Sequence, residues 1–547
     1  MHKVRPLPRR ASEASPKRHG RPVRFRLKTG AIVAVAGAVI AGSTLVEAAP
    51  SSAAPATGTD VITTVVGGGA STVLNNVAST AASLGSPLSA VVDSHGNLVY
   101  ADQNDNLIQV AAATTGTFYG VAMTAGRIYT VVGDPNGAVD DSGPQLSAVL
   151  EDPNGVAVDA AGDIAITDTA NNVILFDPAV TGTYFGQPMT AHVVYPIAAD
   201  ADPTEAVSDQ VFNAGLQSPD GITFDAQGDV VVADTGNDII RLIPRAAHTA
   251  FGQALEPFTI YTIAGNMNYG YTGNGGPATA AELQLDSFNG VAVDPRGDVV
   301  FSDVDNNVVR MVAAASGSYL GRTVTAGDIY TLAGTSKAGY KGAAKPATKA
   351  WLDIPQGVAV DAAGNLFISD SANNRIRFVA NTTGTYDGMA VKIGDIYTVA
   401  GNGATGYVGN GTPATSAELN TPSDVSVAPS GALVVVDSGN NVLREITGGG
   451  AVPTVSAVKP PTGPTTGGRK VTIKGTNLAN TTAVMFGSRS AQSFIVKSAT
   501  KVIAYSPVGA AGTVAVEVRS TTGVSAATTT DSYTYLLTAS KKNRHRS

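Results

Sequence analysis

One sequence unit recurs six times between residues 60 and 447, and it limits the possible folds more than any single residue does. Each copy holds an alternating apolar segment ending in Asp, a Gly turn, a second apolar segment ending in Asp, an Asn pair and a third apolar segment. The first Asp is Asp93, Asp159, Asp225, Asp294 and Asp361, and the second is Asp102, Asp168, Asp234, Asp303, Asp370 and Asp437. Spacings of 66 to 69 residues indicate one supersecondary unit copied in tandem.

Each copy contains four segments of strand length and almost no helical periodicity. In the second copy we predict strands at 155–159, 163–167, 172–176 and 193–197. Four antiparallel strands repeated radially form a β-propeller, so six copies predict six blades.

The two ends of the repeat predict how the ring closes. The sixth copy stops after its third segment, at 441–446, whereas an additional segment at 60–67 precedes the first copy and resembles the fourth segment at 395–401. We therefore expect the N-terminal strand to complete the last blade.

Three motifs resemble the NHL repeat family. They are the Pro-x-Gly entry at 153–159 and 355–361, the Asp-x-x-Asn-Asn loop at 168–172, and the Gly-Asn-Gly-Gly-Pro lead-in that begins at Gly273. The resemblance covers about residues 60 to 447 and implies a six-bladed propeller. Each copy departs from the family by an insertion between its third and fourth segments, as at 181–186, which makes it longer than the usual 40 to 45 residues of a blade.

A second module follows a Gly-rich joint at 448–452. Residues 453–537 contain short alternating strands between Pro and Gly turns, which indicates an immunoglobulin-like sandwich. The sequence there resembles an IPT/TIG domain. The predicted fold class is therefore all-β, with a six-bladed NHL-type propeller followed by an IPT/TIG sandwich. Residues 538–547 form a basic tail, which we interpret as a solvated terminus.

The N-terminal residues have the pattern of an export signal. Residues 1–28 hold ten Lys or Arg and one acid, an uncharged stretch follows at 29–46, and small residues follow that stretch. We assign 1–48 to a cleaved signal and 49–59 to a linker, which predicts a secreted or extracellular surface protein. The alternative is a membrane anchor, because the uncharged stretch nearly reaches the roughly 20 residues needed to span a bilayer.

Charge and composition exclude several classes of partner and site. Without residues 1–48 the chain has 26 basic and 41 acidic side chains, a net charge of −15. Such a surface repels polyanions, so we expect no nucleic-acid partner. The chain has no Cys, which excludes disulfides, zinc-thiolate sites and thiol nucleophiles. We expect a monomer.

The repeated aspartates are predicted to be structural, since a role present in every blade is a role in the fold. Those of the first set open Gly-containing turns, where a carboxylate accepts bonds from backbone N–H groups. Those of the second set are expected to satisfy backbone donors in the loop that follows the second strand.

A candidate binding site lies at the position that varies while its surroundings repeat. Immediately before the innermost strand the six copies have Leu88, Asn154, Asp220, Asn289, Gln356 and Ser423. The propeller resemblance places these residues around one mouth of the central channel. The five polar members are the predicted ligand-binding residues, and water filling of the channel is the alternative.

The sequence offers little support for catalysis. Its six His lie in the terminal segments, a turn and the insertions, and no known nucleophile, zinc or phosphate-loop motif occurs. Six-bladed lactonases and amidating lyases of similar type hold a metal around the channel, where this chain has amides and only Asp220. We predict no catalytic residue, metal or cofactor. The favoured function is binding of a protein or carbohydrate, and the alternatives are a metal-assisted lyase or lactonase and a structural envelope component.

Overall fold

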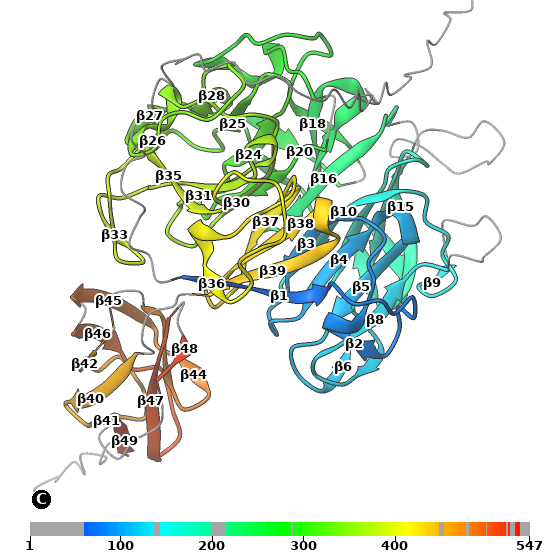
Figure 1. The fold of residues 1–547 in the computed structure, drawn as a ribbon. Helices are drawn as coiled ribbons and strands as arrows, with labels where there is room; N and C mark the ends of the chain where they lie inside the picture. Colours follow the sequence, from blue (N-terminus) through cyan, green and yellow to red (C-terminus); the bar gives the residue numbers. More distant parts are fainter. Residues whose placement is uncertain are drawn as a thin grey trace, which may run out of the picture. The chain divides into compact units, whose positions relative to one another are not determined.

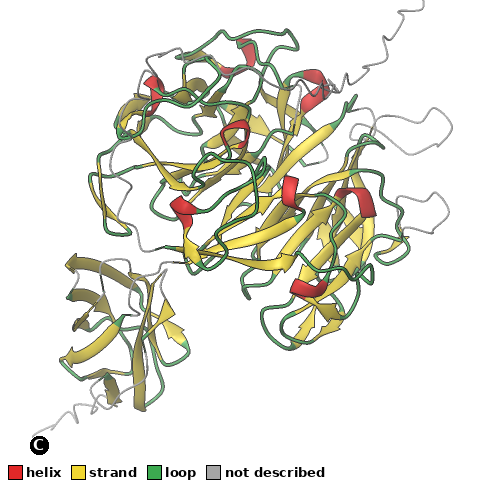
Figure 2. Ribbon diagram, in the orientation of Figure 1, coloured by secondary structure: helices red, strands yellow, loops and turns green. Residues whose placement is uncertain are grey.

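The computed structural model describes residues 60–134, 143–199, 214–447 without 258 and 286–287, and 453–536 with short gaps at 477, 479–480, 499, 521–522 and 526–530. The predicted export signal, both linkers and the basic tail lie outside the described residues. Regular structure in the described parts is strand, interrupted only by three-residue 3-10 turns (Figure 2). None of the described helices is long and apolar enough to cross a membrane.

Six antiparallel sheets form the propeller blades. The second blade consists of β10 (Pro153–Val158), β11 (Ile164–Asp168), β12 (Val173–Asp177) and β15 (Val193–Ala199), which agree with the predicted strands to within two residues. The other blades are β3 (Pro87–Val92), β4 (Leu98–Asp102), β5 (Leu107–Ala111) and β8 (Arg127–Val132); β16 (Pro219–Phe224), β17 (Val230–Asp234), β18 (Ile239–Ile243) and β21 (Tyr261–Ala264); β23 (Val291–Val293), β24 (Val299–Asp303), β25 (Val308–Val312) and β28 (Asp328–Gly334); β30 (Pro355–Val360), β31 (Leu366–Asp370), β32 (Arg375–Val379) and β35 (Asp395–Ala400); and β37 (Asp424–Val427), β38 (Leu433–Asp437), β39 (Val442–Thr447) and β1 (Val61–Gly67).

The blades form a closed ring around their innermost strands. Strands β3, β10, β16, β23, β30 and β37 contact one another in this order, and β37 also contacts β3. Figure 1 shows the blades arranged around these strands. Six clusters of buried apolar side chains fill the spaces between neighbouring blades. The core is thus divided among the six inter-blade interfaces, and each blade depends on two neighbours for burial of its faces.

Strand β1 closes the last blade, as predicted. It pairs antiparallel with β39, where Ile62 lies opposite Ile446 and Thr63 lies opposite Glu445. The first residues of the described propeller therefore share a sheet with its last ones. This pairing satisfies the backbone edge that β39 would otherwise expose.

Two features of the blades differ from the four-strand prediction. Five sheets carry an additional two-residue strand at the outer edge, contributed by the segment that leads into the blade; these are β2 (Val77–Ala78), β9 (Gly143–Pro144), β22 (Gly276–Pro277), β29 (Lys345–Pro346) and β36 (Thr412–Pro413). The insertions form two-stranded hairpins, such as β13 (Gly182–Tyr184) with β14 (Gln187–Met189). The intervening Phe185 and Gly186 have φ values of 47° and 75°, as a type I′ turn requires.

The first set of repeated aspartates has the predicted structural role. Asp159 Oδ1 accepts bonds from the backbone nitrogens of Ala161 at 2.8 Å and Asp163 at 2.9 Å. Equivalent bonds hold the turns at Asp93, Asp225, Asp294 and Asp361.

The second set also accepts backbone bonds, although from a different segment than predicted. Asp168 Oδ1 accepts a bond from the Glu151 nitrogen at 2.7 Å, and the same contact to a residue 17 to 19 positions earlier recurs in the other five copies. These carboxylates therefore tie the lead-in segment to its blade. Four of them also pair with a buried Arg seven residues later: Arg241, Arg310, Arg377 and Arg444.

The C-terminal module is a two-sheet sandwich. One sheet contains β40 (Thr454–Lys459), β42 (Lys470–Thr476), β46 (Lys501–Tyr505) and β45 (Ser493–Ser498). The other contains β41 (Thr462–Pro464), β49 (Ser532–Leu536), β47 (Gly512–Ser520), β43 (Thr481–Phe486) and β44 (Arg489–Ser490), with β48 (Gly523–Val524) beside β47. Buried side chains from both sheets, including Val471, Phe486 and Tyr533, form its core.

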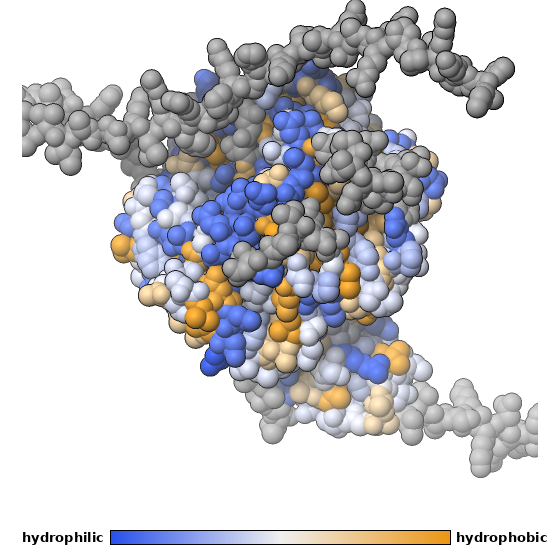
Figure 3. All heavy atoms as spheres, turned by 90° about the vertical axis from the view of Figure 1, so that its right-hand side faces the viewer, coloured by the Kyte–Doolittle hydropathy of each residue, from blue (hydrophilic) through white to orange (hydrophobic). Residues whose placement is uncertain are grey.

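Apolar side chains are dispersed on one face of the molecule. On the face drawn in Figure 3 they form small separate groups among hydrophilic side chains. A dispersed pattern of this kind is usual for a surface in contact with water.

Candidate functional site at the channel mouth

The predicted site residues lie where the innermost strands begin. Asn154, Asp220 and Gln356 are the second residues of β10, β16 and β30. Asn289 and Ser423 shortly precede β23 and β37. Because the innermost strands contact one another in a ring, these positions surround one end of the central channel.

Part of this ring is a continuous line of hydrogen bonds. Gln103 Nε2 donates to Asn154 Oδ1 at 3.0 Å, and Asn154 Nδ2 donates to Asp220 Oδ1 at 2.6 Å. Asp220 is also hydrogen-bonded to Thr235, whose Oγ1 accepts a bond from Asn289 Nδ2 at 3.2 Å. The line connects four consecutive blades and fixes the side chains of Asn154 and Asp220.

Gln103 and Thr235 were not among the predicted residues. Both directly follow the second repeated Asp of their copies, a position that is polar in five of the six copies. In other copies the same position bonds to the backbone of the next blade: Thr169 Oγ1 donates to the Pro219 oxygen at 2.7 Å, and Ser371 Oγ donates to the Pro422 oxygen at 2.6 Å. The sequence signal for an inter-blade contact was therefore present.

Exposure divides the predicted residues into two groups. Asp220, Asn289 and Ser423 are buried, with 4%, 0% and 2% of their surface exposed. Asn154 and Gln356 are partly exposed, so they are the members that can meet a ligand. Ser423 Oγ donates to the Leu88 oxygen at 2.7 Å and joins the sixth blade to the first.

Burial changes the acidity of the one carboxyl in the ring. It raises the pKa of Asp220 to about 6, although the hydrogen bonds from Asn154 and Thr235 act in the opposite direction. Asp220 is therefore largely ionised at neutral pH and becomes protonated in mildly acidic solution. A change of its charge would act directly on the Asn154 amide that it holds.

The channel beyond this ring encloses a cavity of about 250 Å³. Its lining residues come from the innermost strands, and most of them have apolar side chains, including Val158, Phe224 and Val360. Gly221 and Gly290 also line it, and the packing leaves no room for a side chain at Gly221, since a Cβ would lie 2.0 Å from the Asn289 oxygen. The predicted site residues directly precede this lining.

Asp424 is a further polar group of the channel that the sequence reasoning missed. It lines the cavity at a position that is Gly in four copies, and its Oδ2 accepts a bond from the Ala90 nitrogen at 3.2 Å. Burial raises its pKa to about 7, while backbone bonds from Ala90 and Val425 oppose the shift. The signal was the single acid in that column of the repeat.

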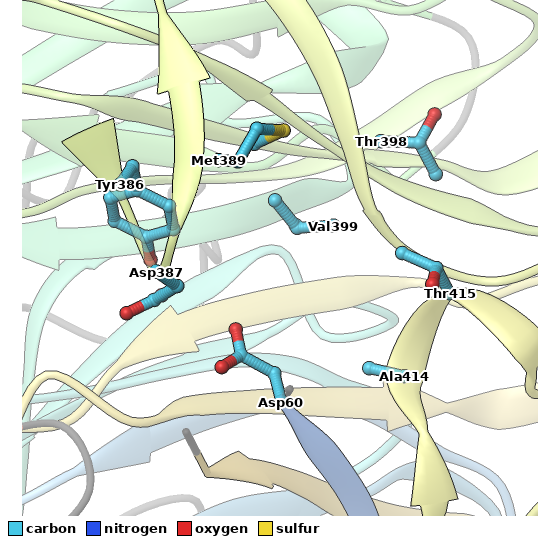
Figure 4. Close-up of a pocket in the computed structure, with 8 residues that line it drawn as sticks. All are labelled: Asp60, Tyr386, Asp387, Met389, Thr398, Val399, Ala414 and Thr415. Atoms are coloured by element: carbon cyan, nitrogen blue, oxygen red, sulfur yellow. The ribbon is translucent and has the colours of Figure 1, made fainter. Parts of the chain in front are cut away.

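The hairpin side of the propeller has its own cavities. One pocket, between the fifth-blade hairpin and the sixth blade, has Asp60, Tyr386 and Asp387 in its wall (Figure 4). Its volume of about 20 Å³ is the size needed for one water molecule. A larger groove of about 220 Å³ between the fourth and fifth blades is lined by Arg322 and Lys392, among others.

A protein site for a metal ion needs several ligand side chains close together. Across the residues that the structure describes, no three His, Asp or Glu side chains are grouped so that they could hold a metal ion.

Family comparisons agree with this architecture. Residues 453–535 match the IPT/TIG domain, and residues 322–447 match the Teneurin NHL domain. The chain joins an NHL-type propeller to an IPT/TIG domain. No curated relative matches the sequence.

Several solved structures are similar to the NHL-type propeller. An auxiliary nutrient binding protein from Bacteroides ovatus is 13% identical, with a TM-score of 0.45 over 71% of this chain and 76% of its own. Virginiamycin B lyase from Staphylococcus aureus is 12% identical, with a TM-score of 0.33 over 66% of this chain and 94% of its own. A gluconolactonase from Xanthomonas campestris is 13% identical, with a TM-score of 0.37 over 71% and 89%.

Proposed function

We propose that the protein is a secreted or cell-surface binding protein that recognises a protein or carbohydrate ligand at the channel mouth of its propeller. The observation that carries this proposal is the fixed, partly exposed Asn154 at a position that varies from blade to blade. Its amide donates to buried Asp220 at 2.6 Å and accepts from Gln103 at 3.0 Å, so it is oriented before any ligand arrives. Preorganised polar groups beside a concave site are typical of ligand recognition.

Gln356 is the second proposed contact residue. It is partly exposed at the same end of the channel, one blade beyond Asn289. Asp220, Asn289 and Ser423 are proposed to position this surface, because they are buried and bonded to neighbouring blades. The closed ring supplies a rigid base, and the IPT/TIG domain is proposed as a spacer or second module.

The proposal is tested by capture from the native cell envelope. Immobilised parent protein and an Asp220→Asn variant are exposed to the same solubilised envelope, and bound proteins and sugars are quantified. We expect saturable capture by the parent and weaker capture by Asp220→Asn, because the amide no longer attracts the Asn154 donor as the carboxylate does. Asp225→Asn is the control, since it changes a similar carboxylate in a turn at the other end of β16.

Equal capture by Asp220→Asn and the parent would place the site elsewhere. Retention of the protein by cells without any saturable ligand would favour a structural envelope component. Stoichiometric metal in purified protein, together with turnover of a lactone or ester, would favour the metal-assisted lyase or lactonase.

A further inference from the structure

The segment that leads into the fifth blade differs in charge from its equivalents. Residues 335–352 align with 266–283 and 402–419, at spacings of 69 and 67. The segment has four Lys and no acid, whereas each of the other two has one Glu and no Lys or Arg. Trp351, the single Trp of the chain, stands where the other segments have Glu282 and Glu418. A local positive surface on a chain with a net charge of −15 after residue 48 needs its own explanation.

Two of these lysines lie over the Trp351 ring. Lys341 Nζ is 4.7 Å and Lys337 Nζ is 5.7 Å from the ring centroid. The Trp351 nitrogen donates to the Lys341 oxygen at 3.1 Å, so the backbone holds this lysine beside the ring. Both lysines are exposed and Trp351 is partly exposed, which leaves the ammonium groups accessible to a ligand.

A second aromatic residue, Tyr340, adjoins this pair in sequence and is held by two arginines and a threonine. Arg375 Cζ is 3.8 Å and Arg377 Cζ is 4.8 Å from its centroid, while its hydroxyl lies 3.1 Å from Thr398 Oγ1. Arg375 is itself held by the carbonyl oxygens of Asn373 at 2.9 Å and Asn402 at 2.7 Å. Tyr340 nevertheless remains 43% exposed, so part of its side chain is open to contact.

The neighbouring blades have the tyrosine without the additional cations. Tyr271 and Tyr407 are 39% and 42% exposed and each lies over one buried Arg, at 5.2 Å and 5.3 Å. The residue equivalent to Arg375 is apolar in every other copy: Leu107, Val173, Ile239, Val308 and Val442. The Tyr–Arg stack is thus a shared structural feature, whereas Lys337, Lys341, Trp351 and Arg375 occur together on the fifth blade alone.

We propose that Trp351, Tyr340, Lys337 and Lys341 form a subsite for an anionic polysaccharide. The exposed part of the Tyr340 ring packs against the C–H face of a sugar ring. The two ammonium groups that lie over Trp351 pair with a carboxylate or phosphate carried by the sugar. Arg375 is a positioning residue, because carbonyl oxygens occupy its donors while its plane supports Tyr340. The inference rests on the proposed binding function. Residues 335–341 directly follow the end of β28, which lies at the same end of the blades as the channel mouth.

The test uses polygalacturonate as the probe, with neutral dextran and single-stranded DNA as comparisons. Binding to the full chain is measured at about 0.15 M ionic strength, where long-range attraction between exposed charges is largely screened. We expect the parent to bind polygalacturonate and not dextran, and to bind it at least tenfold more tightly than DNA. Lys337→Ala/Lys341→Ala should weaken binding at least tenfold.

Two matched variants keep the result interpretable. Trp351→Glu installs the residue that the fourth and sixth blades have at this place, so folding should persist while binding falls at least tenfold. Lys470→Ala/Lys474→Ala removes the same charge from β42 of the IPT/TIG domain and should bind within twofold of the parent, with all melting temperatures unchanged. Weak parent binding, equal binding of DNA, or an equal loss in the β42 variant would overturn the inference. Envelope capture that still depends on Asp220 would in that case leave the proposed function standing.

Discussion

At the scale of residues, the copies differ in the side chains that surround the negatively charged turn Asp. The second, third and fourth copies have a second carboxylate four residues after the turn Asp, and each pair has a basic side chain nearby. Arg245 bridges Asp159 at 2.9 Å and Asp163 at 2.6 Å. His248 lies 3.1 Å from Asp229, and Arg296 pairs with both Asp294 and Asp298.

In the first and fifth copies an Asn amide stands in place of the second carboxylate. Asn97 Nδ2 donates to Asp93 at 2.8 Å, and Asn365 Nδ2 donates to Asp361 at 2.7 Å. An amide needs no counter-ion, and these copies lack the paired Arg. The choice between Asp and Asn at this position therefore agrees with the local balance of charge.

Removal of a turn carboxylate should destabilise the propeller. Asp225 Oδ1 accepts bonds from the nitrogens of Gln227 at 2.8 Å and Asp229 at 2.9 Å. Asp225→Ala should lower the free energy of unfolding by about 1–3 kcal/mol, because both donors lose their acceptor in a half-buried turn. Asp225→Asn keeps one acceptor oxygen and should lose less. Chemical denaturation checks the order, and equal stability of the alanine variant and the parent would contradict it.

A buried carboxyl in the second blade should make stability depend on pH. Asp177 occupies a position that is Ile or Val in four other copies, and burial, together with nearby Asp163, raises its pKa to about 7. A raised carboxyl pKa means that the folded state holds the proton more tightly, so stability is fully present below about pH 4 and is lost as pH rises through 7. Asp177→Val should therefore raise the melting temperature at pH 8 more than at pH 4.

The pKa shift of Asp177 sets an upper bound on this pH-dependent change in stability. A shift from 3.8 to about 7 corresponds to roughly 4 kcal/mol at pH 8. Thermal melts of parent and variant across this pH range measure it. An identical gain at both pH values would show that Asp177 does not titrate in the folded protein with a raised pKa.

At the scale of elements, sequence alone predicted the strands in which apolar residues alternate and which are bounded by Gly and Asp. It missed β9 and its equivalents because a segment of two residues has no periodicity; these segments are strands only because a neighbouring edge is present. It located the insertions without predicting that they fold into hairpins. It also missed the buried Arg–Asp pairs, although their constant spacing of seven residues was visible, because burial of a charge depends on the neighbouring segments.

Ring closure can be tested with a single disulfide. Thr63 and Glu445 are directly opposite each other in β1 and β39, and opposed residues of antiparallel strands are close enough for the bond. The chain has no other Cys, so Thr63→Cys/Glu445→Cys should form one intramolecular disulfide on mild oxidation. Mass spectrometry of the peptide pair checks the linkage.

A mismatched pair supplies the control for closure. Thr63→Cys/Ser430→Cys places the second thiol in the turn between β37 and β38, so it should remain reduced under the same conditions. Oxidation should raise the melting temperature of the matched pair, because the bond constrains the unfolded chain. Failure of the matched pair to oxidise, or equal oxidation of both pairs, would contradict the pairing of β1 with β39.

At the scale of the whole molecule, the alignment of six copies showed which positions vary, and it thereby indicated the channel mouth. It could not show which of those side chains remain accessible. Asp220 is buried and is hydrogen-bonded to Asn154 of the preceding blade and to Thr235 of its own blade. The repeat pattern locates these partners, but it does not show that their packing buries the carboxyl. The variable positions are proposed to serve binding, and the repeated aspartates hold the blades.

The most direct test of this division between binding positions and structural aspartates compares Gln356→Ala with Asp225→Ala. The titrant is the material captured from the envelope. Gln356 is partly exposed at the channel mouth, whereas Asp225 caps a turn at the other end of an innermost strand. We predict that Gln356→Ala binds at least tenfold more weakly in calorimetric titration while its melting temperature stays within about 2 °C of the parent, since surface substitutions rarely exceed about 0.5 kcal/mol. Asp225→Ala should melt earlier and bind normally. Parent-like binding by Gln356→Ala, with Asp225→Ala as the variant that loses the ligand, would contradict the account.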